Sequence, residues 1–421
     1  MEVTKCVLVV DVILIITLSQ NNEASKLTPA AHPLSYALPE ARELKKALGY
    51  NEDTYFNFTE LTSKYGYQSE EHTITTDDGY ILKSFRILPK CNGNKLYPIL
   101  LMHGILDTSD VWIIPGEEVG IGYILAANCY DVWAVNHRGN RYSRRHTTLD
   151  PDRDVAFWNF SFDEIGNFDV PATIDYILQA TNTPKVFYAG HSQGTTDFFV
   201  MASLRPEYNQ KVQVSFHLAP VAWMSNSYSP IPRALSANVD LFKGVLDATG
   251  YIELLARHHL MHLVLEVLCH IAPEPTCGLA LSITTGYEQG TIDPKVLSVA
   301  FGHLLSGTSA KSLAHYGQLV VSKKFKRYDE GAEGNLKRYK QKKTPEYNVS
   351  NVASPVVLIS AKNDWFSSLK DVGTLSSKLP NLLENYVVPE PKWSHHNHIW
   401  DARLRKYVAP KILEYLERYN N

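Results

Sequence analysis

Five short apolar segments set the strongest limit on the fold, because each ends at a turn and leaves room for a helix before the next. They span residues 99–102, 131–135, 186–189, 214–218 and 356–359. Continuous apolar segments that alternate with helices are typical of parallel strands buried on both faces of a sheet. Before them, residues 72–82 surround an Asp-Asp-Gly turn and indicate a hairpin. The pattern therefore predicts a mostly parallel central sheet with helices on both faces.

The fifth segment stands apart from the others, which indicates an insertion. The first four lie between residues 99 and 218, whereas the fifth begins at residue 356. Within that gap, residues 239–268 have the apolar and amphipathic spacing of helices. We therefore expect a helical cap above the carboxyl ends of the strands. The predicted divisions are a signal peptide at 1–19, an N-terminal lead-in at 20–60, the first core part at 61–222, the cap (lid) insertion at 223–353 and the second core part at 354–421.

The N-terminus predicts entry into the secretory route. Lys5 precedes an apolar run at residues 7–18, which only Asp11 interrupts, and polar residues begin at Ser19. The run is too short to span a bilayer comfortably and fits a signal peptide, although a buried N-terminal strand would give the same pattern. No later stretch is long and apolar enough for a membrane helix. We expect a secreted protein, extracellular or in a gut lumen, or a lysosomal one.

Sequons and cysteines agree with that route. Glycosylation is predicted at the three Asn-X-Ser/Thr sites, which are Asn57, Asn159 and Asn348. Cleavage of the signal removes Cys6 and leaves an even number of cysteines, which are Cys91, Cys129, Cys269 and Cys277. Cys269 and Cys277 flank a short proline-containing turn that brings them within reach of a disulfide. Nothing in the sequence requires Cys91 and Cys129 to pair.

Charge gives little guidance to a macromolecular partner. The net charge of −3 offers no whole-protein reason to expect nucleic acid. Residues 323–343 are locally basic, with nine Lys or Arg against three acids. Attraction to an anionic lipid surface is one interpretation of this stretch, and a solvated surface segment near the cap boundary is the other, favoured one.

The strongest chemical signal is Gly190-His191-Ser192-Gln193-Gly194, which fits the G-x-S-x-G pattern. The pattern alone arises by chance, but here it follows a predicted strand and precedes a predicted helix at residues 195–204. In that context Ser192 sits on a strained turn as a nucleophile, and Gly190 and Gly194 avoid collisions with neighbouring backbone. The competing interpretation is a glycine-bounded turn with a surface serine.

A serine nucleophile needs a base, an orienting carboxylate and an oxyanion hole. Asp364 follows the fifth apolar segment, and three histidines near the C-terminus are candidates for the base, namely His395, His396 and His398. A metal site is the alternative for that cluster, but no matched ligand pattern supports it, and we expect neither metal nor cofactor. The oxyanion N–H groups are predicted at Gln193 and Ile105, and His103 is expected to hold backbone.

The chain resembles the acid lipases, a family that includes gastric and lysosomal acid lipases and many insect members. The resemblance extends from about Tyr65 to the C-terminus and is carried by several segments, among them Asp77-Asp78-Gly79-Tyr80, His103-Gly104, Tyr130-Asp131-Val132-Trp133, Arg138-Gly139-Asn140, residues 190–195, Leu218-Ala219-Pro220 and His315-Tyr316-Gly317-Gln318. It implies an α/β-hydrolase fold with an inserted helical cap. It also implies Ser192, Asp364 and His395 as the triad, Ile105 and Gln193 at the oxyanion hole, and a Cys269–Cys277 disulfide.

The resemblance selects His395, because the family places its histidine five residues before a tryptophan and Trp400 occupies that position here. The surrounding residues depart from the family pattern at Ser394, His396, Asn397 and His398. Cys129 replaces a usual glycine, and His137 replaces a smaller residue. These polar surroundings put the pH optimum and ester preference in doubt, while the triad itself is intact.

The expected function is that of a lipase that hydrolyses carboxylic esters of neutral lipids, triacylglycerol or steryl ester, through an acyl-enzyme. The expected partner is a lipid ester at a lipid–water interface, and we expect a monomer. Two alternatives remain, a broad carboxylesterase or peptidase on the same fold and a catalytically silent lipid-binding homologue.

Overall fold

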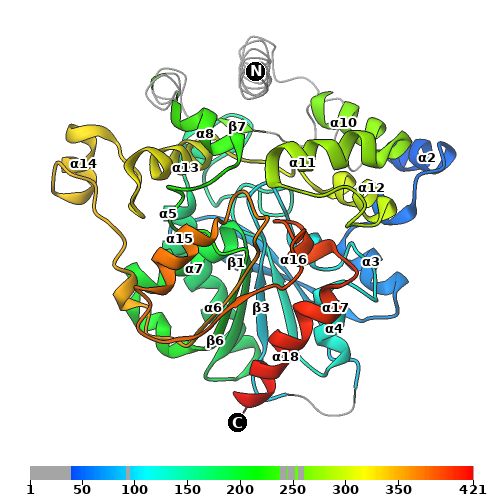
Figure 1. Ribbon diagram of the computed structural model, residues 1–421, viewed down its shortest axis with the longest axis horizontal. Coiled ribbons are helices and arrows are strands. Elements are labelled where there is room, and N and C mark those ends of the chain that lie inside the picture. The colour runs from blue at the N-terminus through cyan, green and yellow to red at the C-terminus, as the bar shows by residue number, and fades with distance from the viewer. Residues whose placement is uncertain (1–38, 92–94, 238–243, 245–251, 255–259, 421) are drawn as a thin grey trace.

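The computed structural model describes residues 39–91, 95–237, 244, 252–254 and 260–420 (Figure 1). The predicted signal peptide lies outside these residues, as do parts of the predicted lead-in and of the helical stretch 239–268.

An eight-stranded sheet runs through the molecule in the order β1-β2-β4-β3-β5-β6-β9-β10. β1 pairs antiparallel with β2, and β2 with β4, whereas all other neighbours are parallel. This confirms the mostly parallel sheet, since the five apolar segments form β3, β4, β5, β6 and β9. The bounds are β1 (Ser69–Thr75), β2 (Ile81–Ile87), β3 (Ile99–Met102), β4 (Val132–Val135), β5 (Val186–His191), β6 (Val212–Leu218), β9 (Val356–Ser360) and β10 (Leu382–Val387).

Alternation of side chains along the strands separates two cores. Ile99 and Leu101 face a core that α4 (Ile121–Ala127) and α18 (Ala409–Arg418) cover. Leu100 and Met102, the intervening residues of β3, face the opposite core, which is covered by three helices, α6 (Val170–Thr181), α7 (Gln193–Leu204) and α15 (Leu369–Ser376). Both faces are therefore buried, which explains why the strand segments are continuously apolar.

Short elements complete the core. The N-terminal helices are α2 (Pro39–Ala47) and α3 (Phe58–Lys64), and further helices are α5 (Phe162–Glu164), α16 (Asn397–Trp400) and α17 (Leu404–Tyr407). Short 3₁₀- or π-helical segments are η1 (Glu52–Thr54), η2 (Ser109–Trp112), η3 (Val155–Trp158), η4 (Ile165–Asp169), η5 (Pro206–Lys211) and η7 (Val349–Asn351).

Between β6 and β9 the chain leaves the sheet and forms a helical region at one end of the molecule, opposite the C-terminus (Figure 1). Its described elements are α8 (Pro230–Ala237), β7 (Glu253–Leu254), α10 (Leu260–Ile271), η6 (Glu274–Gly278), α11 (Leu279–Thr285), α12 (Pro294–His303), β8 (Thr308–Ser309), α13 (Ala310–Ser322) and α14 (Gly331–Tyr339). The boundaries 223–353 and the role of this region as a cap stay predictions.

The basic stretch 323–343 binds the insertion to the core through ion pairs. Arg327 and Arg338 both form ion pairs with Asp163, whose side chain is fully buried. Lys324 forms an ion pair with Glu346, so this cation of the stretch is also partnered by an acid. A buried carboxylate requires such partners, so a structural role accounts for these arginines.

Candidate active site

The carboxyl ends of β3 and β5 are where an open sheet of this strand order places reactive groups. β3 lies between β4 and β5 in the sheet. The chain therefore passes from β3 to its neighbour β4 on one side and later returns to form β5 on the other side of β3. Such a reversal opens a crevice outside the strand ends. The loop after β3 carries Gly104 and Ile105, and the turn after β5 carries Ser192, so both predicted elements of the site meet there.

Ser192 lies on a strained turn between β5 and α7. Its φ is 52° and its ψ is −117°, a left-handed conformation that side chains rarely adopt. A Cβ at Gly190 would lie 2.6 Å from the backbone carbon of Gly194, and a Cβ at Gly194 would overlap the carbonyl oxygen of Met102. Both glycines are therefore required by close backbone packing, as the pentapeptide pattern predicts.

Ser192, His395 and Asp364 form one hydrogen-bonded chain. The Nε2 atom of His395 is 2.8 Å from the Oγ of Ser192, and its Nδ1 is 2.8 Å from Oδ2 of Asp364. All three are buried or nearly so, with 9% of Ser192 exposed. Residues that lie 203 and 31 positions apart in the sequence thus meet with the geometry of a nucleophile, a base and an orienting acid.

Asp364 is held in its charged form. Burial alone would raise its pKa, but the charge of His395 and several hydrogen bonds outweigh burial and lower the pKa below its usual value. The backbone N–H groups of Phe366 and Ser367 donate to Oδ1 at 2.9 and 2.8 Å. This carboxylate is therefore fixed in orientation, with Oδ2 at 2.8 Å and Oδ1 at 3.0 Å from Nδ1 of His395.

The other two C-terminal histidines lie away from the nucleophile. The ring of His396 stacks on Trp400 at 4.6 Å, and the ring of His398 meets Trp393 edge to face at 5.9 Å. Burial lowers the pKa of His398 to about 3, so this imidazole is neutral. Of the three candidate histidines, only His395 contacts Ser192, and His395 is also the residue five positions before Trp400.

The unusual polar residues around His395 bind one another. Asn397 accepts the backbone N–H of Ser394 at 2.9 Å and donates to Asp401 at 2.7 Å and to Thr291 at 3.1 Å. The departures at residues 394 and 397 therefore form a small network that fixes the loop of His395.

Cys129, another departure, has a φ of 72° as a glycine would, and it forms a disulfide with Cys91.

Buried contacts fix the loop after β3, which carries the predicted oxyanion residue Ile105. Gly104 lies against Ser192, because a Cβ there would come within 3.2 Å of the serine Cβ. The pKa of His103 is well below its usual value, chiefly through burial and secondly through the neighbouring His137. The neutral ring donates from Nδ1 to the carbonyl of Gly104 at 2.8 Å and accepts from Asn140 at 3.0 Å. His103 thus holds the backbone of the loop through the carbonyl of Gly104, and Ile105 follows as the predicted oxyanion donor.

The backbone N–H of Gln193 is the second predicted oxyanion donor. Gln193 is the first residue of α7, so its N–H has no partner within the helix. The positive end of the helix dipole also lies at this point. Its side chain is buried, and Nε2 is 3.4 Å from Nε2 of His137.

The remaining sequence candidates lie on the surface or in the insertion. The three sequon asparagines, Asn57, Asn159 and Asn348, are exposed. Cys269 and Cys277 form a disulfide in the insertion, and both are fully buried. Among the residues that the structure describes, no group of three or more His, Cys, Asp or Glu side chains is arranged to hold a metal ion.

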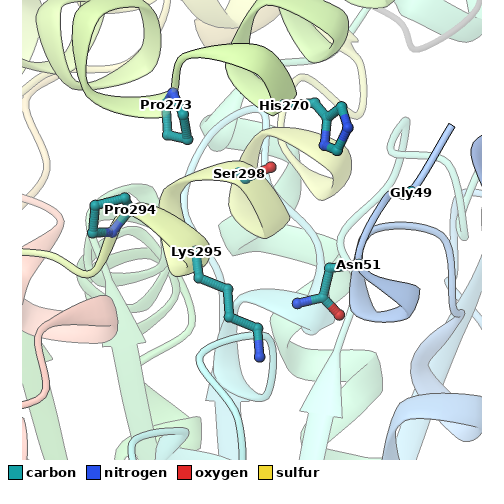
Figure 2. A pocket seen from close by; sticks show the side chains of 7 residues that line it. All are labelled: Gly49, Asn51, His270, Pro273, Pro294, Lys295 and Ser298. Atoms are coloured by element: carbon teal, nitrogen blue, oxygen red, sulfur yellow. The ribbon is translucent and has the colours of Figure 1, made fainter.

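A cavity of about 390 Å³ lies between α10, α12 and the chain segment that follows α2 (Figure 2). His270 and Ser298 line it from the two helices, and Asn51 from the segment. None of the residues of the serine site borders this cavity.

Of the helices in the described ranges, none has the length and hydropathy needed to cross a membrane.

Two features of the structure have no signature in the sequence: a disulfide before β4, at the amino ends of the strands, and a contact of His191 beside Ser192. The Cys91–Cys129 disulfide was left open because the spacing of these cysteines does not require it. His191 received no role, since the G-x-S-x-G pattern leaves that position free, yet its Nε2 is 3.1 Å from the carbonyl oxygen of His395.

The chain matches two family models. One is described as the alpha/beta hydrolase fold and covers residues 97–402, and the other as a partial alpha/beta-hydrolase lipase region and covers residues 58–116. A solved structure from Sulfolobus solfataricus superimposes with a TM-score of 0.55 at 14% identity, covering 83% of this chain and 94% of that one, a likeness of fold alone.

Similar curated proteins carry the name lipase. Lipase 1 of Drosophila melanogaster is 37% identical over 90% of this chain and 83% of its own length. Human lysosomal acid lipase/cholesteryl ester hydrolase is 33% identical over 89% of this chain and 94% of its own length. Gastric triacylglycerol lipase of Rattus norvegicus is 34% identical over 83% of this chain and 89% of its own length.

Proposed function

The chain belongs to the acid lipase family of α/β hydrolases, and from that premise we propose that it hydrolyses neutral lipid esters through Ser192, His395 and Asp364. It is a carboxylic ester hydrolase, as the named relatives are lipases and the family fold is that of a hydrolase. The observation that carries the residue assignment is the pair of 2.8 Å contacts that His395 makes, to Ser192 on one side and Asp364 on the other.

Acylation follows from this arrangement. The Oγ of Ser192 attacks the ester carbonyl carbon while its proton passes to Nε2 of His395. The resulting oxyanion accepts hydrogen bonds from the N–H groups of Ile105 and Gln193. When the intermediate collapses, the bond to the alcohol oxygen breaks and His395 returns the proton to the departing alcohol. The acyl group is then bound as an ester to Ser192.

Deacylation repeats the sequence with water. Water attacks the acyl carbon and gives a proton to Nε2 of His395, and the same two N–H groups stabilise the second oxyanion. Collapse breaks the bond to Oγ, which recovers the proton from His395, and the carboxylic acid leaves. Asp364 remains ionised throughout and stabilises the imidazolium that forms twice in each turnover.

Apolar side chains beside the triad favour a lipid acyl chain as substrate. The ring of Phe366 lies 5.0 Å from the ring of His395, and Ile105 packs against the same core as Phe366. The substrate class we propose is triacylglycerol or steryl ester at a lipid–water interface. Secretion or lysosomal delivery suits the two disulfides, which persist in oxidising compartments. We further propose that the enzyme acts as a monomer.

The test is a pair of serine variants. Ser192→Ala should abolish turnover of short and long acyl esters and prevent labelling by a serine-reactive phosphonate. Ser203→Ala is the matched control, because it removes a buried hydroxyl without a hydrogen-bond partner from α7, the helix that follows Ser192. The control should keep full activity. Ester turnover by folded Ser192→Ala protein, or labelling at another serine, would refute the assignment.

A chain-length series separates the lipase from its alternatives. A lipase should prefer long acyl esters presented as an emulsion, whereas a broad carboxylesterase would favour short, dissolved esters. A catalytically silent lipid-binding protein would turn over neither and would not react with the phosphonate.

A further inference from the structure

His191 joins the nucleophile to the loop of the base. It is the last residue of β5, directly before Ser192, and only 2% of it is exposed. Its Nε2 lies 3.1 Å from the backbone carbonyl oxygen of His395, which is 204 positions away in the sequence. Across the described residues, the contact from Ser192 to His395 is the only other hydrogen bond between the end of β5 and this loop.

The protonation of His191 follows from its surroundings. Burial lowers its pKa well below the usual value, and the nearby imidazoles of His395, His396 and His398 lower it further. A neutral imidazole carries one N–H, and a carbonyl oxygen accepts only from an N–H. Nδ1 has no partner among the described residues. The proton therefore resides on Nε2, which donates to the carbonyl of His395.

The same ring also borders the oxyanion loop. A Cβ at Gly104 would come within 3.4 Å of Nδ1 of His191 and within 3.2 Å of the Cβ of Ser192. The ring centroid of His191 lies 5.0 Å from that of His395. One side chain thus occupies the space between the loop after β3 and the loop that carries the base, while its own backbone continues into the nucleophile.

We propose that His191 is a positioning residue that holds the base loop in register with Ser192 through the carbonyl of His395. This inference rests on the proposed function of the triad and deepens it. Without the N–H of His191, the carbonyl of His395 becomes a buried acceptor without a partner, and the loop shifts to satisfy it. A shift of the order of 1 Å at reacting groups costs about 100-fold in rate, because the Ser192–His395 contact lengthens.

Two amide variants test the reach of the donor. The amide nitrogen of His191→Gln falls near the position of Nε2, whereas that of His191→Asn falls near Nδ1, too short to reach the carbonyl. Both keep an amide side chain, and they differ by one methylene group. A third variant, His191→Leu, removes the donor altogether.

Activity is measured per labelled site, with a phosphonate counting the sites that react. For His191→Asn and His191→Leu we expect kcat about 10- to 100-fold lower with KM within about twofold, as for the loss of a group that orients a catalytic side chain. For His191→Gln we expect kcat within about fivefold of the unaltered enzyme, since its donor is kept.

His315 supplies the matched control. It is a fully buried histidine in the insertion, and its Nε2 makes the same kind of bond, to the carbonyl of Lys326 at 2.9 Å. His315→Asn and His315→Gln should lower the Tm without changing kcat per labelled site. A purely structural role for His191 would give this same pattern at residue 191.

The outcomes separate the two proposals. Equal kcat for His191→Gln and His191→Asn would overturn the role of His191, because the two differ only in the reach of the donor. An unaltered enzyme that neither hydrolyses esters nor labels at Ser192 would instead overturn the proposed function. If His191→Leu does not fold, the comparison of the two amides still decides the question.

Discussion

Changing Asp364 to Asn should disable the base while leaving the fold almost intact. In the structure, Oδ1 of Asp364 receives two backbone N–H groups, from Phe366 at 2.9 Å and Ser367 at 2.8 Å. An amide NH₂ group cannot accept these bonds, so the amide oxygen stays at the Oδ1 position. The NH₂ group must then take the place of Oδ2, 2.8 Å from Nδ1 of His395.

That orientation favours the wrong tautomer of the base, because the NH₂ group at the Oδ2 position lies nearer to Nδ1 of His395, at 2.8 Å, than the amide oxygen at the Oδ1 position, at 3.0 Å. With an NH₂ donor facing it, Nδ1 of His395 becomes the acceptor, and the ring proton moves to Nε2, which can no longer take the proton of Ser192. Loss of kcat for a carboxylate-to-amide change of this kind is about 10⁴-fold, equivalent to about 5 kcal/mol of transition-state stabilisation. Steady-state hydrolysis of a soluble ester, with Tm as the measure of folding, gives the effect directly.

A second buried carboxylate controls for the charge change itself. Asp371, at the start of α15, accepts from Asn226 at 2.8 Å and from Ser368 at 2.9 Å but makes no contact with the triad. Asp371→Asn should lower Tm and leave kcat unchanged. The tautomer argument is wrong if folded Asp364→Asn retains kcat within about tenfold of the unaltered enzyme, since that leaves less than about 1.4 kcal/mol for the effect.

Two further predictions concern the neighbouring histidines and acid stability. Alanine at His395 should lower kcat by several orders of magnitude, whereas alanine at His396 or His398 should act mainly on Tm, and equal kcat losses at all three would contradict the register. Burial alone would raise the pKa of Glu164, but nearby cations that include Arg338 lower it to about 2. Because this acid is charged more readily in the folded state, its contribution to stability is complete above about pH 4.5 and disappears as the pH falls towards 2. Urea unfolding between pH 2 and 7 should therefore show a flatter acid limb for Glu164→Gln, and unchanged curves would refute the pairing.

The apolar strands that the sequence predicts are those in which nearly every residue is buried. β3 is apolar at every position because helices cover both faces of the sheet, and its predicted bounds match the observed ones. β10 went unpredicted because it pairs only with β9 at the edge of the sheet, and its residues are mostly half-buried. An edge strand has no continuous apolar pattern, so its sequence, Leu-Leu-Glu-Asn-Tyr-Val, resembles an ordinary surface segment.

The site could be predicted wherever a strained backbone fixes the residue type. Ser192 needs glycine on both sides for steric reasons, and that requirement is visible in five consecutive residues. The partners of a long-range hydrogen bond carry no such local signature. The contact from His191 to the carbonyl of His395 uses a backbone atom as acceptor, which no residue type at position 395 reveals. The Cys91–Cys129 disulfide depends in the same way on how two loops meet.

The strain at Ser192 leaves the base loop as the part of the site that can adapt, and four of the departures from the family pattern, at residues 394 and 396–398, lie in that loop. A non-glycine residue held at a φ of 52° costs of the order of 1–3 kcal/mol, and rigid packing against Met102 and Leu218 must maintain it. The nucleophile therefore cannot adjust to its partners, and the base loop has to bring Nε2 to a fixed Oγ. That loop needs only one imidazole in place and a carbonyl that is held, and here the bonds of Asn397 to Ser394 and Asp401 fix it. Sequence change is tolerated in the part that can adapt, provided that the hydrogen bonds that fix its position are kept.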